Sequence, residues 1–260
     1  MRRDEDKLEG RNVVIEALRR KRRRVYKVLL DERAKNNPKI RLLLELIAEM
    51  GTPLTRVRRD RLDQMSETGV HNGVIAFAEP LPHYTIAERM EEVFTQGHDP
   101  FFVLADELNY EHNLGALLRS AMGAGVHGVV VPVRRGKGLT PVVQRVAMGG
   151  AEEVPVIREG ISSSLMTLKR AGIPIVGADM DGAPPWSVRL SGPVAIVLGG
   201  EDKGLTAPVR KKCDAIVGIP LAGGLDSLNV SVTGGILMFE KRRQDAVLQA
   251  AREAAARADG

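Results

Sequence analysis

The chain has 260 residues, of which 43% are hydrophobic, so it is long enough for one large or two smaller globular domains with a substantial core. Aromatic residues make up only 3% and Cys213 is the single cysteine, which argues against base-stacking platforms, a disulfide framework and a Cys-rich zinc site. The net charge is +5, and no apolar run approaches the roughly 20 residues that a membrane helix needs.

Basic residues are concentrated near the start of the chain, as "RRKRRR" at residues 19–24 and "RVRRDR" at residues 56–61. Such runs repel themselves unless a polyanion neutralises them, so we expect a nucleic-acid partner; the alternative is a solvated face that keeps the protein soluble. The side chains expected to contact the nucleic acid are Arg20, Lys21, Arg22, Arg23, Arg24, Arg58 and Arg59. The opening "MRRDEDKLEGRN" lacks the apolar segment of a secretory signal, and we expect a cytoplasmic protein.

The first ~80 residues have the pattern of a small α/β unit. "GRNVVIEALRRK" carries apolar residues at helical spacing, and "PKIRLLLELIAEMG" begins with proline and ends with glycine, as helices commonly do. "RVYKVLLDE" and "GVIAFAEP" are expected strands, and "SETGVHNG" is an expected loop before the second of them. A proline-bounded connection at residues 79–100, with one short helix, marks the domain boundary.

Beyond this connection, valine-rich strands alternate with helices. The expected strands are "FFVLADE", "GVVVPV", "PIVGAD", "VAIVLGG" and "AIVGIPL". The expected helices are "LGALLRSAMGAG", "TPVVQRVAMGGA", "SSLMTLKRAG", "TAPVRKKC" and "VTGGILMFEKRRQ", the last continuing into an alanine-rich tail. This alternation predicts an α/β domain with a mostly parallel sheet covered on both faces.

Gly123, Gly125 and Gly128 form a G-x-G-x-x-G pattern, which can mark a dinucleotide-binding turn. That turn needs a strand before the glycines and a helix after them, because the helix N-terminus faces the pyrophosphate. Here the predicted helix comes first and the strand follows, so the pattern does not predict a dinucleotide cofactor. We expect Gly123 and Gly125 to terminate the helix instead.

Three separated segments place polar residues at predicted strand ends or helix starts. "HNLGALLRSA" contains Asn113 and Arg119, "VLGGEDKGL" contains Glu201, and "IPLAGGLDSLNVSVTGG" contains Ser227 and Asn229. Open α/β sheets bind ligands beyond the carboxyl ends of their strands, and glycines there let a ligand approach the backbone. Taken singly, each segment is equally consistent with ordinary turn chemistry, with Ser227 or Asn229 capping a helix.

Taken together and in this order, the three segments resemble the motifs of the SpoU family of S-adenosylmethionine-dependent RNA ribose 2′-O-methyltransferases. "GRNVVIEAL" and "GVHNGVIA" resemble the family's RNA-binding domain of ribosomal-protein type. "HNLGALLRSA", "AGVHGVVVP" and "VAMGGAEEVP" resemble in particular the members that methylate a guanosine in large-subunit (23S) ribosomal RNA.

The resemblance implies an N-terminal α/β RNA-binding domain at residues 1–78, a linker at 79–98, a catalytic α/β domain at 99–243 and a helical tail at 244–260. It implies a parallel sheet whose C-terminal chain forms a deep trefoil knot, which is an exception to the rule against knots. It also implies S-adenosylmethionine as the cofactor, ribosomal or other structured RNA as the partner, and a homodimer with its sites near the interface. Neither a membrane nor a metal is implied.

By resemblance, Arg119 is the catalytic arginine. Because a guanidinium pKa lies above about 12, we expect Arg119 to hold the ribose or a phosphate and to stabilise the forming alkoxide rather than to remove the proton. Asn113 is expected to orient Arg119 or a phosphate and Glu201 to anchor the site. Ser227 and Asn229 are expected to fix the RNA or the loop.

The resemblance also implies the donor pocket, whose expected lining residues are Gly177, Leu198, Gly199, Ile219, Leu221 and Leu228. His71, in "GVHNG", is a further candidate RNA contact. Two features depart from the family pattern: Asp202 adds a charge near the donor, and Gly234 with Gly235 would allow close helix packing at the dimer. The five histidines are scattered and predict no metal site.

Two alternatives remain open at this point. The same chemistry could act on transfer RNA or on an antibiotic-resistance site of ribosomal RNA, since specificity resides in loops and in the N-terminal domain. A non-catalytic RNA-binding protein that retains the knot is the other alternative. The presence of Arg119, Glu201 and Asn229 counts against it.

Overall fold

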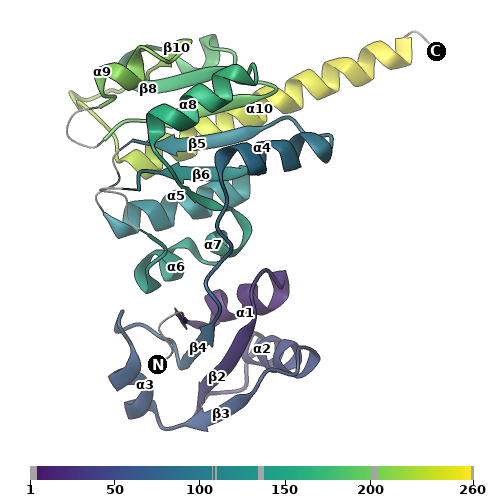
Figure 1. Ribbon diagram of the computed structural model, residues 1–260, viewed down its shortest axis with the longest axis vertical. Coiled ribbons are helices and arrows are strands. Elements are labelled where there is room, and N and C mark those ends of the chain that lie inside the picture. The colour runs from purple at the N-terminus through teal and green to yellow at the C-terminus, as the bar shows by residue number, and fades with distance from the viewer. Residues whose placement is uncertain (1–4, 107, 109, 134–137, 201–203, 259–260) are drawn as a thin grey trace. The chain divides into compact units, whose positions relative to one another are not determined.

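The computed structural model describes residues 5–106, 108, 110–133, 138–200 and 204–258. Contacts divide the chain into two compact units: unit 1 combines Met1–Pro82 with Gly138–Glu153, and unit 2 combines His83–Lys137 with Val154–Gly260 (Figure 1). Residues 138–153, which the sequence analysis assigned to the catalytic domain, therefore pack with the N-terminal segment. Among the described residues, no helix is both long and apolar enough to cross a membrane.

Unit 1 contains a four-stranded sheet. Its elements are β1 (Asp6–Glu9), α1 (Arg11–Arg20), β2 (Val25–Asp31), α2 (Pro38–Glu49), β3 (Leu54–Val57), α3 (Arg59–Met65), β4 (Val74–Ala78), α6 (Pro141–Ala147) and α7 (Gly150–Glu153). The strand order is β1-β4-β2-β3, with β4 antiparallel to β1 and β2, and β3 parallel to β2. The expected α1, α2, β2 and β4 are confirmed. Strands β1 and β3 and helix α3 were not predicted, because their charged residues hid the short apolar pattern.

Helix α2 shows how local sequence sets a boundary in unit 1. The side chain of Asn37 accepts a hydrogen bond from the backbone N–H of Ile40 at 3.1 Å, and Pro38 occupies the first turn, where its missing N–H costs nothing. The helix ends just before Gly51, whose φ of 60° lies in the left-handed region. Both ends agree with the sequence prediction.

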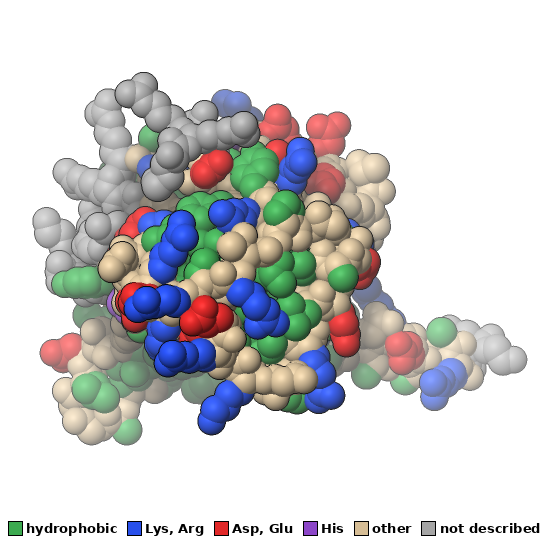
Figure 2. Space-filling view, turned by 90° about the horizontal axis from the view of Figure 1, so that it is seen from below, with side chains coloured by type: hydrophobic (Ala, Val, Ile, Leu, Met, Phe, Trp, Pro, Cys, Tyr) green, Lys and Arg blue, Asp and Glu red, His purple; other side chains and the backbone are tan. Residues whose placement is uncertain are grey.

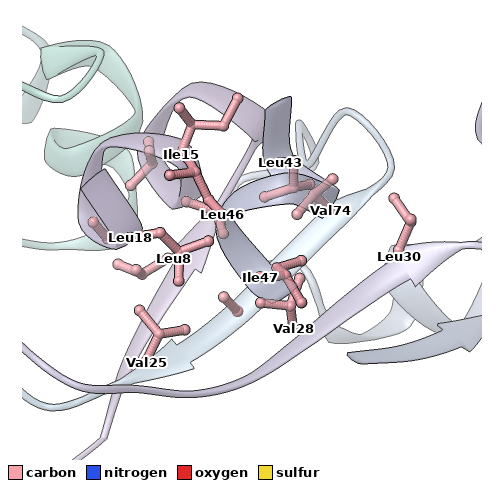
Figure 3. Packing of buried hydrophobic residues seen from close by; sticks show 14 of the residues in the cluster. Leu8, Ile15, Leu18, Val25, Val28, Leu30, Leu43, Leu46, Ile47 and Val74 are labelled. Atoms are coloured by element: carbon pink, nitrogen blue, oxygen red, sulfur yellow. The ribbon is translucent and has the colours of Figure 1, made fainter. Parts of the chain in front are cut away.

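The two faces of the unit 1 sheet pack against different helices. Val28 and Leu30 of β2 point toward α1 and α2 and pack with Leu43 (Figure 3). Leu29 points the other way and packs with Leu62 of α3. This division follows from the alternation of side chains along a strand.

Unit 2 contains a six-stranded sheet. Its elements are α4 (Ile86–Thr95), β5 (Phe101–Ala105), α5 (Glu111–Ala124), β6 (Gly128–Val131), β7 (Val156–Arg158), α8 (Ile161–Arg170), β8 (Ile175–Ala183), η1 (Pro185–Ser187), β9 (Val194–Leu198), α9 (Ala207–Arg210), β10 (Ala215–Val217) and α10 (Val230–Ala258). The order is β10-β8-β9-β5-β6-β7, and every neighbouring pair is parallel. The predicted parallel α/β sheet is confirmed, with β7 as an additional strand.

Helices cover both faces of the unit 2 sheet. Helices α4, α8 and α9 supply residues to the core on the face that carries Phe102 and Leu104. Helices α5 and α10 pack on the opposite face, where a Cβ atom on Gly234 would lie 2.6 Å from Leu117 Cδ1 and 2.9 Å from Leu198 Cδ1. Gly234 thus lets α10 approach α5 and β9 closely within one chain. The close packing expected at a dimer is therefore found, for Gly234, within one chain.

The glycines of the G-x-G-x-x-G pattern have separate roles. Gly125 follows α5 with φ 71°, and its N–H donates to the carbonyls of Ala121 and Met122, so it terminates the helix as predicted. Gly123 lies inside α5, so the prediction that it ends the helix is wrong. Gly128 begins β6. Helix α5 therefore comes before the glycine turn and strand β6 comes after it, whereas a dinucleotide-binding turn has the strand first and the helix second.

Candidate functional site

A cavity of about 700 Å³ lies at the carboxyl ends of β8, β9 and β10 in unit 2. Five of the six residues predicted to bind the donor line it, namely Leu198, Gly199, Ile219, Leu221 and Leu228. A site at the carboxyl edge of a parallel sheet agrees with the general rule for α/β folds. Its volume falls in the range of pockets that hold drug-sized ligands.

The sixth predicted lining residue, Gly177, does not line the cavity. A Cβ atom on Gly177 would lie 2.6 Å from Leu205 Cδ1 and 2.7 Å from Cys213 Sγ, on the α9 side of the sheet. The next residue, Ala178, pairs with Leu198 across the β8–β9 ladder and lines the cavity. Alternation along β8 thus puts Ala178 where the sequence analysis expected Gly177.

Several lining residues were missed by the sequence analysis, although each is close in sequence to a predicted one. Met180 and Leu225 are apolar and 69% and 62% exposed, so the cavity has two solvent-facing apolar walls suited to a flat ring. Asp179, Asp226 and Thr233 add polar groups to the lining. The signal for these positions was their proximity to strand ends and to the third motif.

Arg210 at the end of α9 fixes the acidic wall of the cavity. Its guanidinium donates to Asp179 Oδ2 at 2.6 Å and to both carboxylate oxygens of Asp181 at 2.9 Å. Asp179 lines the cavity, whereas Asp181 is exposed. The planar fork of arginine presents several donors in a fixed geometry, so it can hold both carboxylates at once, one of them through two hydrogen bonds. Arg210 therefore positions the end of β8 at the cavity wall.

The first and third motifs meet beside this cavity. Asn229 Nδ2 donates to Asn113 Oδ1 at 3.0 Å, joining residues 116 positions apart. Asn229 Oδ1 also accepts from the backbone N–H and the hydroxyl of Ser231, so Asn229 caps the start of α10. The helix-cap alternative is thus confirmed for this residue, and its role in the site stays a prediction.

In unit 1, one arginine of the "RRKRRR" run, Arg23, is buried. The Arg23 side chain is 0% exposed and pairs with Asp6 at 2.7 Å and with Glu152 of α7. It also donates to Gln144 Oε1 of α6 at 2.8 Å. Burial raises the pKa of Glu152, and the Arg23 guanidinium opposes that rise. The prediction that Arg23 contacts RNA is therefore wrong, because its guanidinium is enclosed and fully partnered.

Neighbouring residues of the same run also have partners inside unit 1. Arg22 donates to the backbone carbonyls of Glu152 and Glu153 at the end of α7. Arg20 forms an ion pair with Glu153 at 2.9 Å, and Lys21 forms one with Glu49 at 2.9 Å. Arg24 is exposed, with its guanidinium 5.9 Å from the centre of the Tyr26 ring. Much of this basic run thus attaches residues 138–153 to the rest of unit 1.

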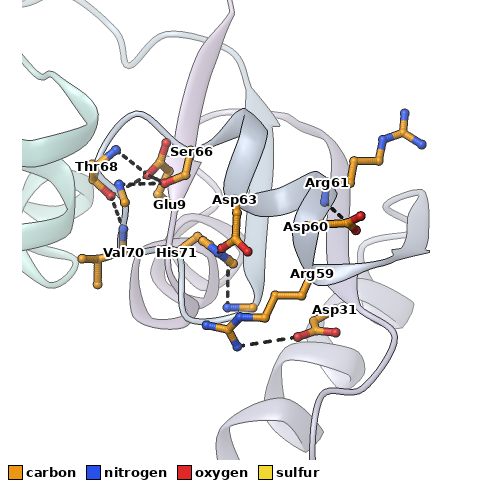
Figure 4. Close-up of polar contacts among 12 residues, drawn as sticks. Glu9, Asp31, Arg59, Asp60, Arg61, Asp63, Ser66, Thr68, Val70 and His71 are labelled. Carbon is orange, nitrogen blue, oxygen red and sulfur yellow. Dashed lines mark hydrogen bonds and ion pairs between the residues drawn. The ribbon is translucent and has the colours of Figure 1, made fainter.

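The second basic run and His71 lie around α3 (Figure 4). Arg58 and Arg59 remain largely exposed, at 74% and 64%, beside Asp60 and Asp31. His71 is 2% exposed; its Nδ1 accepts from the N–H of Gly73 at 3.1 Å, which leaves Nε2 to donate to Asp63. The prediction that His71 contacts RNA is wrong in this structure, since its ring is buried and holds the loop.

Glu9 anchors the other end of that loop. It accepts from the hydroxyl of Ser66 at 2.7 Å, the N–H of Glu67 at 2.7 Å and the N–H of Thr68 at 3.1 Å (Figure 4). Burial acts to raise the pKa of Glu9, but these hydrogen bonds together hold it below its usual value. The polar loop predicted before β4 is therefore an ordered structure.

Cys213 does not supply a nucleophile at neutral pH. Burial raises the pKa of its thiol to about 11, and the nearby Asp214 adds to the rise. Within the described part of the chain, no group of three or more His, Cys, Asp or Glu side chains is arranged to hold a metal ion.

Two family models match the chain. Residues 100–239 match the SpoU rRNA Methylase family, and residues 7–84 match the RNA 2′-O ribose methyltransferase substrate binding domain. The chain belongs to the SpoU family. The first match covers the cavity and all three motifs, and the second covers the sheet of unit 1.

Curated relatives of this SpoU protein match over 78% to 94% of its length. A 23S rRNA (guanosine-2′-O-)-methyltransferase RlmB of Pseudomonas putida is 36% identical over 92% of this chain and 96% of its own. The RlmB of Escherichia coli is 36% identical over 78% of this chain and 84% of its own. A putative TrmH family tRNA/rRNA methyltransferase YacO of Bacillus subtilis is 35% identical over 94% of this chain and 98% of its own.

Solved structures share the fold of this SpoU protein. A crystal structure described as an RNA 2′-O ribose methyltransferase is 28% identical, covers 93% of this chain and 89% of its own, and has a TM-score of 0.76. The methyltransferase AviRb from Streptomyces viridochromogenes in complex with AdoMet is 24% identical, covers 94% and 91% of the two chains, and has a TM-score of 0.74.

The predicted catalytic residues of this SpoU protein are only partly brought together. Ser227 lines the cavity, and Asn113 and Asn229 lie in contact with each other. Arg119 is exposed on α5, outside the cavity lining, and forms no hydrogen bond or ion pair with any described residue. Glu201 and Asp202 lie outside the described residues; their segment is bounded by Gly200 and Gly204, whose backbones exchange hydrogen bonds of 3.0 and 3.1 Å.

Proposed function

We propose that this protein transfers a methyl group from S-adenosylmethionine to the ribose 2′-hydroxyl of a guanosine in 23S ribosomal RNA. The observation that carries the proposal is the meeting of the first and third SpoU motifs, through Asn113 and Asn229, beside a cavity at the strand ends. The relatives named RlmB, at 36% identity, support the substrate. A ribosomal substrate also places the enzyme in the cytoplasm.

The cavity fits the donor in size and chemistry. Apolar walls from Leu198, Ile219 and Leu228 suit a heteroaromatic ring. Asp179 and Asp226 supply negative charge for the positive groups of the donor, with the charge of Asp179 offset by Arg210. The donor supplies an electrophilic methyl group on a sulfonium. The residues of the chain would exclude water and fix the donor's position.

The residues outside the cavity act on the RNA. Arg119 would hold the ribose or a flanking phosphate and stabilise negative charge as the 2′-hydroxyl loses its proton. Asn113 and Asn229 hold the starts of α5 and α10 together, which fixes the helix that carries Arg119. Ser227, exposed at the cavity, would contact the RNA or the loop, and Glu201 would anchor the second motif.

In our proposal the enzyme acts as a homodimer. Val232, Ile236 and Phe239 follow one another at helical spacing on α10 and are 48%, 40% and 51% exposed. A Cβ atom on Gly123 would lie 3.5 Å from the Phe239 ring, and Arg119 lies one turn before Gly123 on α5. Pairing of two copies through this apolar stripe would bring Arg119 to the interface, which supports a site completed at the dimer.

The trefoil knot belongs to the same proposal. The chain passes very close to itself where β10 ends beside the end of β8: a Cβ atom on Gly182 would lie 2.3 Å from the carbonyl carbon of Val217. Only glycine permits two backbones to approach this closely. Such a crossing beside the cavity supports a threaded C-terminal segment that shapes the donor pocket.

Mapping 2′-O-methyl groups tests the function. Ribosomal RNA from cells with and without this protein is compared, and purified protein is then given radiolabelled S-adenosylmethionine with transcripts of 23S and transfer RNA. We expect one 23S guanosine to lose its methyl group without the protein and to regain it in vitro. The name of the Bacillus relative includes transfer RNA, so methylation of transfer RNA alone would support that second candidate and refute the ribosomal one. Failure to bind the donor would refute both.

A further inference from the structure

Two sets of cations in unit 1 differ in the partners of their side chains; other exposed cations, such as Lys27 and Arg61, belong to neither set. The first set is the "RRKRRR" run, in which Arg20, Lys21 and Arg23 form ion pairs with carboxylates and Arg22 donates to backbone carbonyls. A cation already paired with a protein carboxylate must give up that pairing before it neutralises a phosphate. These residues are therefore poor candidates for the main RNA contacts, although their sequence is the most basic in the chain.

The second set is Arg33, Lys35, Arg41 and Arg56, which are exposed. Within the described part of the chain, no side chain forms an ion pair or hydrogen bond with any of their side-chain nitrogens. Arg33 and Lys35 lie in the loop between β2 and α2, Arg41 lies on α2, and Arg56 lies on the edge strand β3. Four unpaired cations thus come from three neighbouring segments of unit 1.

A hollow of about 350 Å³ lies among these segments. It is lined by Ala34, Asn36, Ile40, Arg41, Leu44, Glu45 and Arg56. Arg56 pairs in register with Leu30, whose side chain is in the core beneath α1 and α2, so Arg56 points to the same face of the sheet as α2. The hollow is therefore a groove between α2 and β3, and we call it the α2–β3 groove. In the face drawn in Figure 2, Lys and Arg side chains stand around hydrophobic patches.

The chemistry of the groove suits one or a few nucleotides. Leu44 is half-buried and provides an apolar surface for a base above the buried side chain of Ile40, while Arg41 and Arg56 provide guanidiniums for the flanking phosphates. Asn36 can hydrogen-bond a base edge, and Glu45 can accept from a base amino group. Because few aromatic residues are available in this chain, an apolar floor with guanidinium planes takes the place of a stacking platform.

We propose that the α2–β3 groove holds an unpaired stretch of the substrate RNA, with Arg41 and Arg56 on its phosphates. The proposal rests on the proposed function, since the RNA bound here is the one that is methylated. It replaces the "RRKRRR" run as the main RNA contact of unit 1. The match of residues 7–84 to a substrate-binding domain supports RNA as the occupant.

The test compares two double variants of the full chain. Arg41→Gln with Arg56→Gln removes two unpaired charges from the groove, and Arg19→Gln with Arg20→Gln removes two exposed, carboxylate-paired charges from the run. Binding to a 23S ribosomal RNA transcript is measured by filter retention at several salt concentrations. Donor binding and the thermal unfolding of each variant are measured alongside.

For the groove variant we expect the Kd for RNA to rise about 10-fold near 0.1 M salt. The plot of the logarithm of the association constant against the logarithm of the salt concentration should become less steep, its negative slope losing about one to two in magnitude. The KM for RNA should rise while kcat at saturating RNA changes less than about twofold, because the groove is remote in sequence from the motifs. The control variant should stay within about threefold of the wild type in Kd. Donor binding should be unchanged in both.

Two results would overturn the inference. If the groove variant binds RNA as the wild type does, the groove is not the contact, and the proposed function stands if methylation persists. If the control loses more affinity than the groove variant, the basic run carries the contact. A wild-type protein that binds and methylates no RNA would refute the proposed function and this inference together.

Discussion

Arg119 is the residue on which the proposed chemistry depends. It is exposed on α5 and has no partner among the described residues, so its guanidinium is available to a substrate. A lysine would keep the charge but lose the planar fork that can contact two oxygens at once. A lysine variant therefore measures how much the planar fork contributes to the rate of methylation.

We expect Arg119→Lys to lower kcat/KM for RNA methylation by at least about 10-fold, because charge stabilisation depends on the geometry of the donors. The free energy of unfolding and donor binding should not change, since the side chain is exposed. Arg170→Lys, an exposed arginine on α8, is the matched control. A near wild-type rate for Arg119→Lys would show that the fork has no catalytic importance.

His127 ties the start of β5 to the start of β6. Its Nδ1 accepts from the backbone N–H of Phe101 at 3.0 Å, so the ring must be deprotonated at that nitrogen. Burial lowers the pKa of His127 to about 4, and the nearby Arg89, His98 and Lys241 contribute to the lowering.

A lowered pKa makes stability depend on pH in a definite direction. Above about pH 6.5 the ring is neutral in both the folded and the unfolded chain; as pH falls toward 4, only the unfolded chain takes up the proton. We therefore expect the unfolding free energy of unit 2 to fall by about 1 to 2 kcal/mol between pH 7 and pH 5 because of this group. Chemical denaturation should show a smaller fall in His127→Asn. Equal falls in the two proteins would contradict this role.

At the scale of elements, α6 and α7 are attached to unit 1 by buried charges. Glu152 is 1% exposed, and its partner Arg23 is fully buried. Breaking such a pair leaves a buried charge without a partner, whereas an exposed pair such as Arg19 with Glu16 contributes little.

We expect Arg23→Met to destabilise the packing of α6 and α7 by about 3 kcal/mol, and Glu152→Gln to recover part of that loss in the double variant. Hydrogen exchange of peptides covering residues 141–153 measures the effect, with Arg19→Gln as the control. If Arg23→Met and the control exchange at the same rate, the buried pair does not hold this segment.

At the scale of the whole molecule, the apolar stripe of α10 predicts a dimer. In Figure 1 the helix continues well beyond the sheet of unit 2. The residues of the stripe belong to the first part of the helix, where Phe239 lies against Gly123 of α5. Exposed apolar side chains at helical spacing favour pairing with a second copy. The first motif lies on α5 and the third at the start of α10, so pairing there is relevant to the site.

We expect Ile236→Glu with Phe239→Glu to convert the protein from a dimer of twice 28.3 kDa to a monomer and to lower methylation at least about 10-fold. Met166→Glu, on α8 at similar exposure, is the control and should remain dimeric. Sedimentation velocity distinguishes the two masses. A wild-type protein that is monomeric at micromolar concentration would refute the dimer.

The sequence by itself determined the features that depend on neighbours in the chain. Alternating valine-rich strands and helices predicted the parallel sheet, and Pro38 predicted the start of α2. The second and third motifs pointed to five residues that do line the cavity. These features follow from local periodicity and from backbone chemistry, which act over a few residues.

Only the tertiary structure decided which side chains are available. Arg23 and Arg41 are both arginines of the N-terminal segment, but one is enclosed with Glu152 and the other is exposed, with no ion-pair partner among the described residues. Likewise Ala178, not Gly177, faces the cavity, because the register of β8 against β9 sets which residue points which way. Ion pairs and strand register join residues far apart in the chain, and no local pattern specifies them.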